Sequence, residues 1–297
     1  MTKSKNFHLF LMDGEVTGRI KCTLSNWTGL AYKIPRSHLD KCKDRQDLKQ
    51  GGVYFLFGKN DQDEDEVYIG QAGIRKNGEG VLFRVAEHLK DAAYFSEAVI
   101  LTTQNNSFGP TEVSYLENRF TNLAIETGRY NVRNSNDPNR GNVTEEKESE
   151  LEDFIEYSQM VLGVLAYKIF VPIITQKKEE IQEEEDLLLY LSRKTNKSGG
   201  RRIEAQCKRT SEGFVVLKGS MIDAIDSSGI PKSVQELRAK CMANGEIIDG
   251  RITKNYLFNS PSYAGSFVLG ASVNGRTYWK NANRVTLKEL EEKEMEP

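Results

Sequence analysis

The chain has little cysteine and histidine, and what it has is scattered. Its 297 residues contain four cysteines and three histidines, and no two cysteines form a CxxC pair. Structural zinc sites need such ligands at short, regular spacings, so the sequence argues against one. Widely separated cysteines also give no disulfide framework, and we expect reduced thiols.

Long hydrophobic stretches are also absent. The longest apolar segment, residues 160–174, is interrupted by Lys168 and Pro172. It is shorter than the roughly 20 residues that a membrane-spanning helix needs. The first five residues are polar and no long apolar run follows, unlike a secretory signal peptide. We therefore expect a cytoplasmic protein that does not bind membranes.

The net charge of −2 gives no indication of a nucleic-acid partner, but the charges are unevenly distributed. Residues 1–45 contain nine lysines and arginines against four acids, and residues 179–186 are nearly all acidic. Such segregation can build a local basic patch on a nearly neutral protein. Ordinary solvated surface is the alternative, and the sequence leaves both open.

The length predicts two domains and a connector. We expect leader strands in residues 1–50, packed on a small domain in residues 51–140. A helical extension and charged linker should follow in residues 141–198, with residues 176–198 as a helical or flexible connector. Residues 199–297 should form a smaller C-terminal α+β domain.

The hydrophobic pattern of the small domain predicts the order β-β-α-β-α. Glycine-bounded, β-branched and aromatic runs predict strands at residues 51–58, 67–69 and 98–103, the first two as an antiparallel pair. Helical spacing covers residues 81–91, and Pro110 and Gly128 mark the ends of a second helix. This order describes an α/β domain with a central antiparallel sheet flanked by helices.

The same signals outline the rest of the chain. They predict strands at residues 7–12, 30–34, 166–171, 203–208 and 213–219, and helices at residues 150–163, 234–242 and 260–270. Ser260 and Pro261 have the form of a helix start. Asn274-Gly275 is typical of a hairpin turn.

Residues able to do chemistry lie on the elements of the small domain. Tyr54 ends a Gly-Val-Tyr tripeptide and Tyr68 begins Tyr-Ile-Gly on the paired strands. Arg84 and His88 are four residues apart and so share one face of the next helix. Glu117 lies at the edge of an apolar helix stripe, where a buried carboxylate must be paired or bind a metal. Taken singly, each would more often be a core aromatic or a solvated surface residue.

Taken together and in this order, these residues resemble the pattern of the GIY-YIG nuclease family. That family includes homing endonucleases, some restriction enzymes and the incision subunit of bacterial nucleotide excision repair. The resemblance covers about residues 50–135 of this chain. It implies that residues 51–140 form a nuclease domain that hydrolyses DNA phosphodiester bonds with one divalent cation, Mg²⁺ or Mn²⁺.

The resemblance also implies a role for each residue. Glu117 matches the glutamate that binds the metal, and Arg84 the arginine that neutralises charge developing on the scissile phosphate. Tyr54 matches a general base or water-positioning tyrosine, and Tyr68 a second tyrosine that shapes the same site. His88 stands where some members use a residue that assists proton transfer.

The family's later asparagine is either Asn134 or Asn131, and we favour Asn134 because Asn-Asp-Pro follows it closely. The chain departs from the family pattern at two points. Gly-Val-Tyr replaces Gly-Ile-Tyr, and Gln71 follows the second tripeptide where some members carry a charged residue. The second departure puts in question how the reactivity of Tyr54 is tuned.

The residue types suit this chemistry without the family name. Phosphodiester hydrolysis needs a nucleophile, a cation and a group that stabilises the leaving oxygen. Tyrosine has a pKa near 10, so it acts as a base only when a neighbouring cation or metal-bound water lowers that pKa. Arg84 is always charged and is a suitable neighbour. A site with one carboxylate, water and substrate phosphate suits magnesium or manganese.

The flanks resemble parts of uncharacterised bacterial proteins that carry this nuclease domain. Residues 5–50 are similar to their leader strands, and residues 213–290 to their C-terminal domain of unknown function. That domain is either a folded module without further role or a DNA-contacting module aided by Lys197, Arg201, Arg202, Lys208 and Arg209. For the whole chain, the alternative to an active endonuclease is a catalytically silent DNA-binding or regulatory protein. The sequence names no protein partner.

Overall fold

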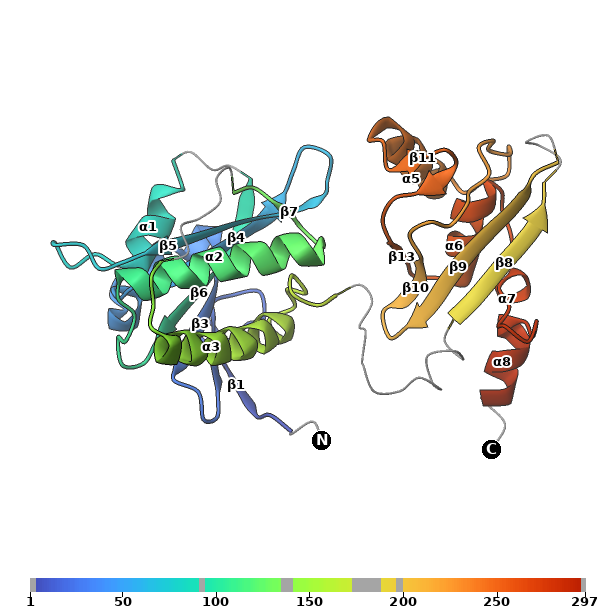
Figure 1. The fold of residues 1–297 in the computed structure, drawn as a ribbon. Coiled ribbons are helices and arrows are strands. Elements are labelled where there is room, and N and C mark those ends of the chain that lie inside the picture. Colours follow the sequence, from blue (N-terminus) through green and yellow to red (C-terminus); the bar gives the residue numbers. More distant parts are fainter. Residues whose placement is uncertain (1–3, 91–93, 135–140, 173–187, 196–199, 295–297) are drawn as a thin grey trace. The chain divides into compact units, whose positions relative to one another are not determined.

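The computed structural model describes residues 4–90, 94–134, 141–172, 188–195 and 200–294 (Figure 1). The chain divides into two compact units, Met1–Pro172 and Ile173–Pro297. Among the described residues, unit 1 contains two buried apolar clusters and unit 2 contains one. Within the described ranges, no helix is both long and apolar enough to cross a membrane.

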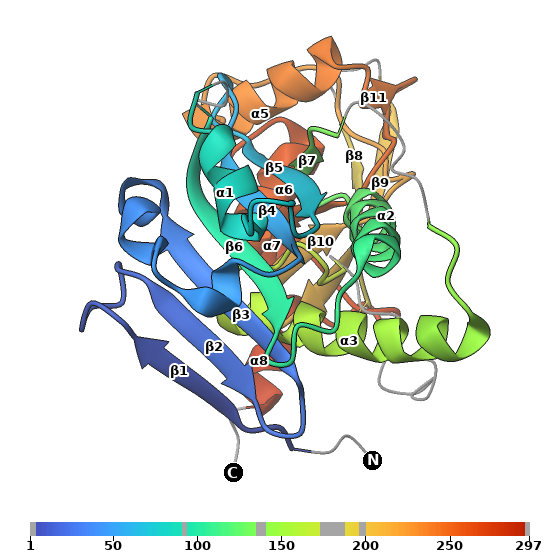
Figure 2. The same cartoon turned by 90° about the vertical axis from the view of Figure 1, so that its left-hand side faces the viewer.

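Unit 1 is a mixed α/β unit built on one sheet. Within the described residues its strand order is β1-β2-β3-β6-β4-β5-β7. The strands are β1 (Phe7–Leu11), β2 (Ile20–Leu24), β3 (Gly29–Pro35), β4 (Gly52–Lys59), β5 (Asp65–Ala72), β6 (Phe95–Thr103) and β7 (Asn131–Val132). All neighbours are antiparallel except β5 and β7. Figure 2 shows β1, β2, β3 and β6 side by side. The expected α/β class, with a mainly antiparallel sheet, is confirmed.

Helices cover both faces of this sheet. The helices α2 (Pro110–Thr127) and α3 (Glu145–Val164) lie on one face (Figure 1). The short helix α1 (Val81–Glu87) covers the other. Side chains alternate between the faces of a strand. On β4, Phe55 accordingly packs in the cluster under α2 and α3, whereas Tyr54 and Leu56 pack in the cluster under α1.

Local signals set the ends of α2, as the sequence predicts. Pro110 occupies the first helical position, and the Glu112 carboxylate accepts a hydrogen bond from the Gly109 N–H at 3.1 Å. Gly128 ends the helix with a φ of 64°, in the left-handed region that favours glycine. The predicted β-β-α-β-α order is observed as β4, β5, α1, β6 and α2.

Four expectations from the sequence are corrected, and one strand was not anticipated. Residues 166–171 form turns rather than a strand, because Ala166 has a φ of 74° and Tyr167 packs into the core, stacked on Phe57 with ring centroids 3.9 Å apart. The helix expected at residues 81–91 ends at Glu87, and Asp91 lies outside the described residues. Strand β2, which the pattern did not reveal, adds Ile20, Cys22 and Leu24 to the core.

The other two corrections concern unit 2. Part of the expected connector, Leu188–Lys194, is strand β8, whereas residues 173–187 and 196–199 lie outside the described residues. Asn274-Gly275 does not form a hairpin turn. Asn274 instead caps the short helix α7 (Gly275–Tyr278), its side-chain oxygen accepting from the Arg276 N–H at 3.1 Å.

Unit 2 contains a four-stranded sheet with the order β13-β10-β9-β8 in its described part. Besides β8, its strands are β9 (Arg202–Thr210), β10 (Gly213–Val216) and β13 (Tyr256–Phe258), with β11 (Ile247–Ile248) and β12 (Arg251–Ile252) as a separate pair. The helices are α5 (Lys232–Ala243), α6 (Pro261–Leu269), α7 and α8 (Leu287–Glu294). As predicted, Ser260 caps α6 by accepting a hydrogen bond from the Tyr263 N–H at 3.2 Å.

A buried arginine joins α5 to the rest of unit 2. Arg238 is fully buried, and its Nε donates to the Asp226 carboxylate at 2.7 Å. Its guanidinium also donates to the backbone carbonyls of Asp223 and Phe267. A buried charge is tolerated only when it is hydrogen-bonded in this way.

We predict that Arg238→Ala lowers the free energy of unfolding of unit 2 by about 3 kcal/mol, because a carboxylate and two carbonyls lose their donor. Hydrogen–deuterium exchange of the full chain will measure this as faster exchange in α5 and α6. The exposed Gln235 lies on the same helix, and Gln235→Ala is the matched control. Equal loss of protection in unit 1 would contradict the division into two units.

Candidate active site

The site begins with a close contact between two paired strands. Tyr54 on β4 lies directly opposite Gly70 on β5. A Cβ atom at position 70 would lie only 2.4 Å from Tyr54 Oη, so a side chain there would displace the tyrosine. Tyr54 is 1% exposed, and its hydroxyl lies against Gly70. The two tripeptides thus meet in space, with the glycine of one beneath the tyrosine of the other.

Helix α1 brings two more residues to Tyr54. Val81 and Val85 anchor the helix in the core, which leaves Arg84 near Tyr54. His88 follows the end of the helix, with its Nε2 atom 2.8 Å from Tyr54 Oη. Its ring centroid lies 5.2 Å from that of Tyr68 and 5.5 Å from that of Tyr54. The structure therefore brings both tyrosines, the arginine and the histidine together.

The electrostatics keep Tyr54 in its neutral form. Burial is the main cause that raises the pKa of Tyr54 above its usual value near 10, and neighbouring Tyr68 adds to this. The guanidinium of Arg84 acts in the opposite direction and lowers that pKa. Tyr54 is thus a protonated phenol that shares a hydrogen bond with His88.

Arg84 belongs to a network that sequence reasoning missed. Its Nη1 donates to Glu87 Oε2 at 2.8 Å, and Arg75 donates to the same carboxylate through two bonds of 2.8 and 2.9 Å. The hydrogen bonds from Arg75 and then Arg84 lower the pKa of Glu87 to about 2, so this carboxylate stays ionised. The i,i+3 spacing of Arg84 and Glu87 is the sequence signal that could have predicted their ion pair, whereas no such spacing predicts the bonds from Arg75. Glu87 orients Arg84, and Arg75 ties the preceding loop to α1.

Glu117 differs from the other acids of unit 1 in its surroundings. It lies half-buried on α2, and among the described residues it has no hydrogen-bond or ion-pair partner. Burial raises the pKa of Glu117 to about 7, and nearby Arg84 lowers it only in part. Its charge also acts on Tyr54, so the carboxylate lies within electrostatic reach of the tyrosine–arginine group.

Asn134 supports the site from the far side of β5. Its side-chain amide donates to the Ile69 carbonyl at 2.7 Å and accepts from the Ile69 N–H at 3.1 Å. It thereby continues the β5–β7 pairing next to Tyr68, where β7 ends. Asn131 instead bonds to Glu64, away from the tyrosines. Of the two asparagines, Asn134 is the one placed to hold Tyr68, as a positioning residue.

The side chains at this site suit a metal ion that keeps most of its bound water molecules. Among the described residues, no three histidine, cysteine or acidic side chains gather around one point to hold a metal ion. A magnesium or manganese ion at this site would have Glu117 as its carboxylate ligand and take the others from water and phosphate. A half-buried carboxylate without a protein partner fits that arrangement, because a cation would compensate its burial.

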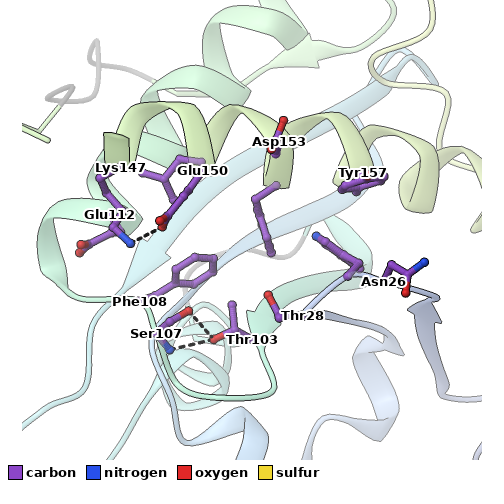
Figure 3. A pocket seen from close by; sticks show the side chains of 13 residues that line it. Asn26, Thr28, Thr103, Ser107, Phe108, Glu112, Lys147, Glu150, Asp153 and Tyr157 are labelled. Atoms are coloured by element: carbon purple, nitrogen blue, oxygen red, sulfur yellow. Dashed lines mark hydrogen bonds and ion pairs between the residues drawn. The ribbon is translucent and has the colours of Figure 1, made fainter. Parts of the chain in front are cut away.

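A cavity among the described residues of unit 1 lies away from the tyrosines. It has a volume of about 310 Å³ and lies between α3, the start of α2 and the turn before β3 (Figure 3). Phe108 and Phe154 line it, and the Lys147–Glu150 ion pair lies along α3 at its rim. It shares no residue with the tyrosine site, so the motif residues and this cavity are separate features.

Comparison with known proteins bears on unit 2 alone. A family model described as "Domain of unknown function (DUF4357)" matches residues 196–291. No match was found among curated proteins or solved structures. The expectation of a C-terminal domain of unknown function is confirmed.

We predict that Gly70→Ala destabilises the protein by about 1–3 kcal/mol, the usual cost of overpacking. The added methyl group would overlap Tyr54 Oη and the ring carbon next to it. Urea denaturation measures the loss, with Gly73→Ala as the control, because a Cβ there meets nothing within 4 Å. Tyr54→Phe should restore part of the stability of Gly70→Ala. Equal stabilities of the two alanine variants would contradict the contact.

The raised pKa of Glu117 gives a second prediction. Because the folded-state pKa of about 7 exceeds the ordinary value of 4.5, protonated Glu117 contributes stability below pH 4.5 that is lost as pH rises through 7. Compared with Glu117→Gln, the wild-type protein should therefore lose thermal stability between about pH 5 and about pH 8. At the higher pH, Mg²⁺ should restore it to the wild type only. Equal stabilisation of both proteins by Mg²⁺ would exclude Glu117 as the ligand.

Proposed function

We propose that unit 1 is a GIY-YIG-type nuclease domain that hydrolyses DNA phosphodiester bonds with one Mg²⁺ or Mn²⁺. The observation that carries this proposal is the unpaired, half-buried carboxylate of Glu117 within electrostatic reach of Arg84 and the Tyr54–His88 pair. An ordinary surface would place these groups in water or pair the acid with a base. In this proposal Glu117 supplies the metal ligand, Arg84 the cation that contacts the phosphate, and Tyr54 the base, the groups that phosphodiester hydrolysis requires.

Tyr54 and His88 form a proton relay in this proposal. Tyr54 Oη takes a proton from the attacking water and passes its own phenolic proton to His88 Nε2, 2.8 Å away. The transfer avoids a free phenolate, which burial makes unfavourable. Tyr68 packs against His88 and holds the imidazole ring in place. A positioned base of this kind typically contributes a factor of about 10²–10⁴ in rate.

In this proposal Arg84 and the cation at Glu117 neutralise the negative charge of the phosphate. Arg84 is part-exposed, with a side-chain exposure of 42%, so it can contact a phosphate while Glu87 orients its guanidinium. When bound at Glu117, the cation would supply the positive charge that polarises the phosphoryl oxygen. Asn134 keeps the β5 backbone, and with it Tyr68, in register with the site.

The second candidate function is a catalytically silent DNA-binding or regulatory protein with the same fold. Glu117 argues against this second function, because a protein without catalysis has no need of a half-buried acid without a partner. The same holds for its grouping with Tyr54, Arg84 and His88. Plasmid nicking with Mg²⁺, with Mn²⁺ and with chelator separates the two functions.

We predict that the wild type nicks plasmid DNA only with a divalent cation and that Glu117→Ala abolishes this activity while leaving DNA binding in place. Arg84→Ala and Tyr54→Phe should each slow cleavage by about 100-fold or more, and His88→Ala should cost less, because water in the vacated space can accept the Tyr54 proton. Exposed Glu126 lies on the same helix as Glu117, so Glu126→Ala is the control and should cut at the wild-type rate. Cleavage by Glu117→Ala at the control rate would show that the site lies elsewhere.

A further inference from the structure

The described part of unit 2 is basic, although the chain is nearly neutral. Residues 188–195 and 200–294 contain 17 lysines and arginines against 11 acids, and residues 173–297 as a whole contain 20 against 18, because residues 179–186 are nearly all acidic. Basic residues of a nearly neutral protein indicate an anionic partner when they gather on one surface.

Strands β8 and β9 have one covered and one uncovered face. Leu189, Leu191, Ile203, Ala205 and Cys207 are buried in the unit 2 core together with residues of α6. The alternate residues point the other way, and most of them are exposed. Figure 1 shows α6 behind β9 and no helix over the near side of these strands. We call this uncovered surface the open sheet face, formed by Tyr190, Ser192, Lys194, Arg202, Glu204, Gln206 and Lys208.

Cations outnumber acids on the open sheet face. It carries Lys194, Arg202 and Lys208 against Glu204. Lys194 and Arg202 are cross-strand partners, so two positive charges lie side by side, and neither has an ion-pair partner among the described residues. In the described ranges, the Arg202 guanidinium donates to the hydroxyl of Ser192 at 3.0 Å. Like charges placed directly opposite each other destabilise a sheet, and a bound anion would relieve that repulsion.

The spacing on this face suits a sugar–phosphate backbone. Arg202 and Lys208 lie six residues apart on one strand, on the order of 20 Å at 3.3 Å per residue. Between them, Tyr190 lies opposite Gln206 with 36% of its surface exposed, an aromatic ring on which a base or sugar can pack. Lys280 pairs with Tyr190 through the backbone at the outer edge of β8 and adds a fourth cation, with Glu289 nearby.

By contrast, several basic residues elsewhere in unit 2 are neutralised within the unit. Arg209 forms two bonds to Glu294, and Arg276 bonds to Glu291 at 2.6 Å. Lys232 and Lys288 face acids one helical turn away on α5 and α8. The adjacent charges of Lys194 and Arg202 are not balanced in this way, which distinguishes the open sheet face from these helices.

We propose that the open sheet face of unit 2 binds the phosphate backbone of DNA. The choice of DNA as the polyanion rests on the proposed nuclease function of unit 1, and the location of the surface rests on unit 2 alone. Lys194, Arg202 and Lys208 contact phosphates, while Tyr190 and Gln206 contact sugars or bases between them. Unit 2 thus adds affinity for DNA to whatever affinity unit 1 has.

The test is fluorescence anisotropy of labelled duplex and single-stranded DNA with the full chain in chelator, where no metal-dependent cleavage takes place. The variant Lys194→Gln/Arg202→Gln/Lys208→Gln removes the charges of the face. Its matched control, Lys232→Gln/Lys288→Gln/Lys293→Gln, removes the same charge from α5 and α8. We expect the face variant to bind at least one form of DNA about 10-fold more weakly. The slope of log affinity against log salt should fall by about 2–3, because each phosphate that the protein neutralises contributes about 0.9 to it.

If both triple variants weaken DNA binding equally, the effect is one of net charge and the proposal is overturned. Unchanged DNA binding by the face variant would also overturn it. Stronger face-dependent binding to an RNA duplex of the same sequence would overturn the assignment to DNA. The outcome is independent of catalysis: a protein that binds DNA through this face but cuts none refutes the nuclease proposal and leaves this inference standing.

Discussion

The contact between Tyr54 and Gly70 is the constraint on which the site depends. Antiparallel pairing of β4 and β5 sets the two residues opposite each other, and the missing side chain of the glycine admits the tyrosine ring. Because Tyr54 is held there, its hydroxyl meets His88 at the end of α1. The neighbouring parts of the sheet fix this register, with β6 beside β4 and the Asn134 amide beside β5.

Around that contact, the protein holds groups in states that folding alone would not favour. Tyr54 is buried as a phenol, and Glu117 is half-buried without a partner, which raises its pKa to about 7. Arg84 lies near both, and Glu87 and Arg75 keep it oriented. Perturbed titratable groups of this kind cluster where chemistry is done. Elsewhere in unit 1, buried or half-buried acids such as Glu66 and Asp47 have basic partners.

Much of the fold could be predicted from local signals. The β-β-α-β-α order, the ends of α2 at Pro110 and Gly128, and the Ser260 cap all follow from short-range chemistry. The wrong predictions concern segments whose structure depends on tertiary packing. Residues 166–171 look like a strand because their apolar side chains fill a core. Asn274-Gly275 caps a short helix that the local sequence does not predict. For the site, motif order pointed to the residues that surround Tyr54. The Arg75–Glu87 bonds and the isolation of Glu117 depend on which segments fold beside them, and no spacing encodes that.

The most direct measurement is a crystal structure of the full chain with Mn²⁺ and a DNA strand made uncleavable by a modified phosphate, using the anomalous scattering of manganese to locate the ion. We expect one peak bonded to the Glu117 carboxylate and to a phosphate oxygen. Arg84 should contact the same phosphate, and Tyr54 Oη should lie within hydrogen-bond distance of a water in line with the leaving oxygen. A well-ordered DNA phosphate elsewhere, with no manganese at Glu117, would contradict the assignment of this site as a metal-dependent nuclease centre.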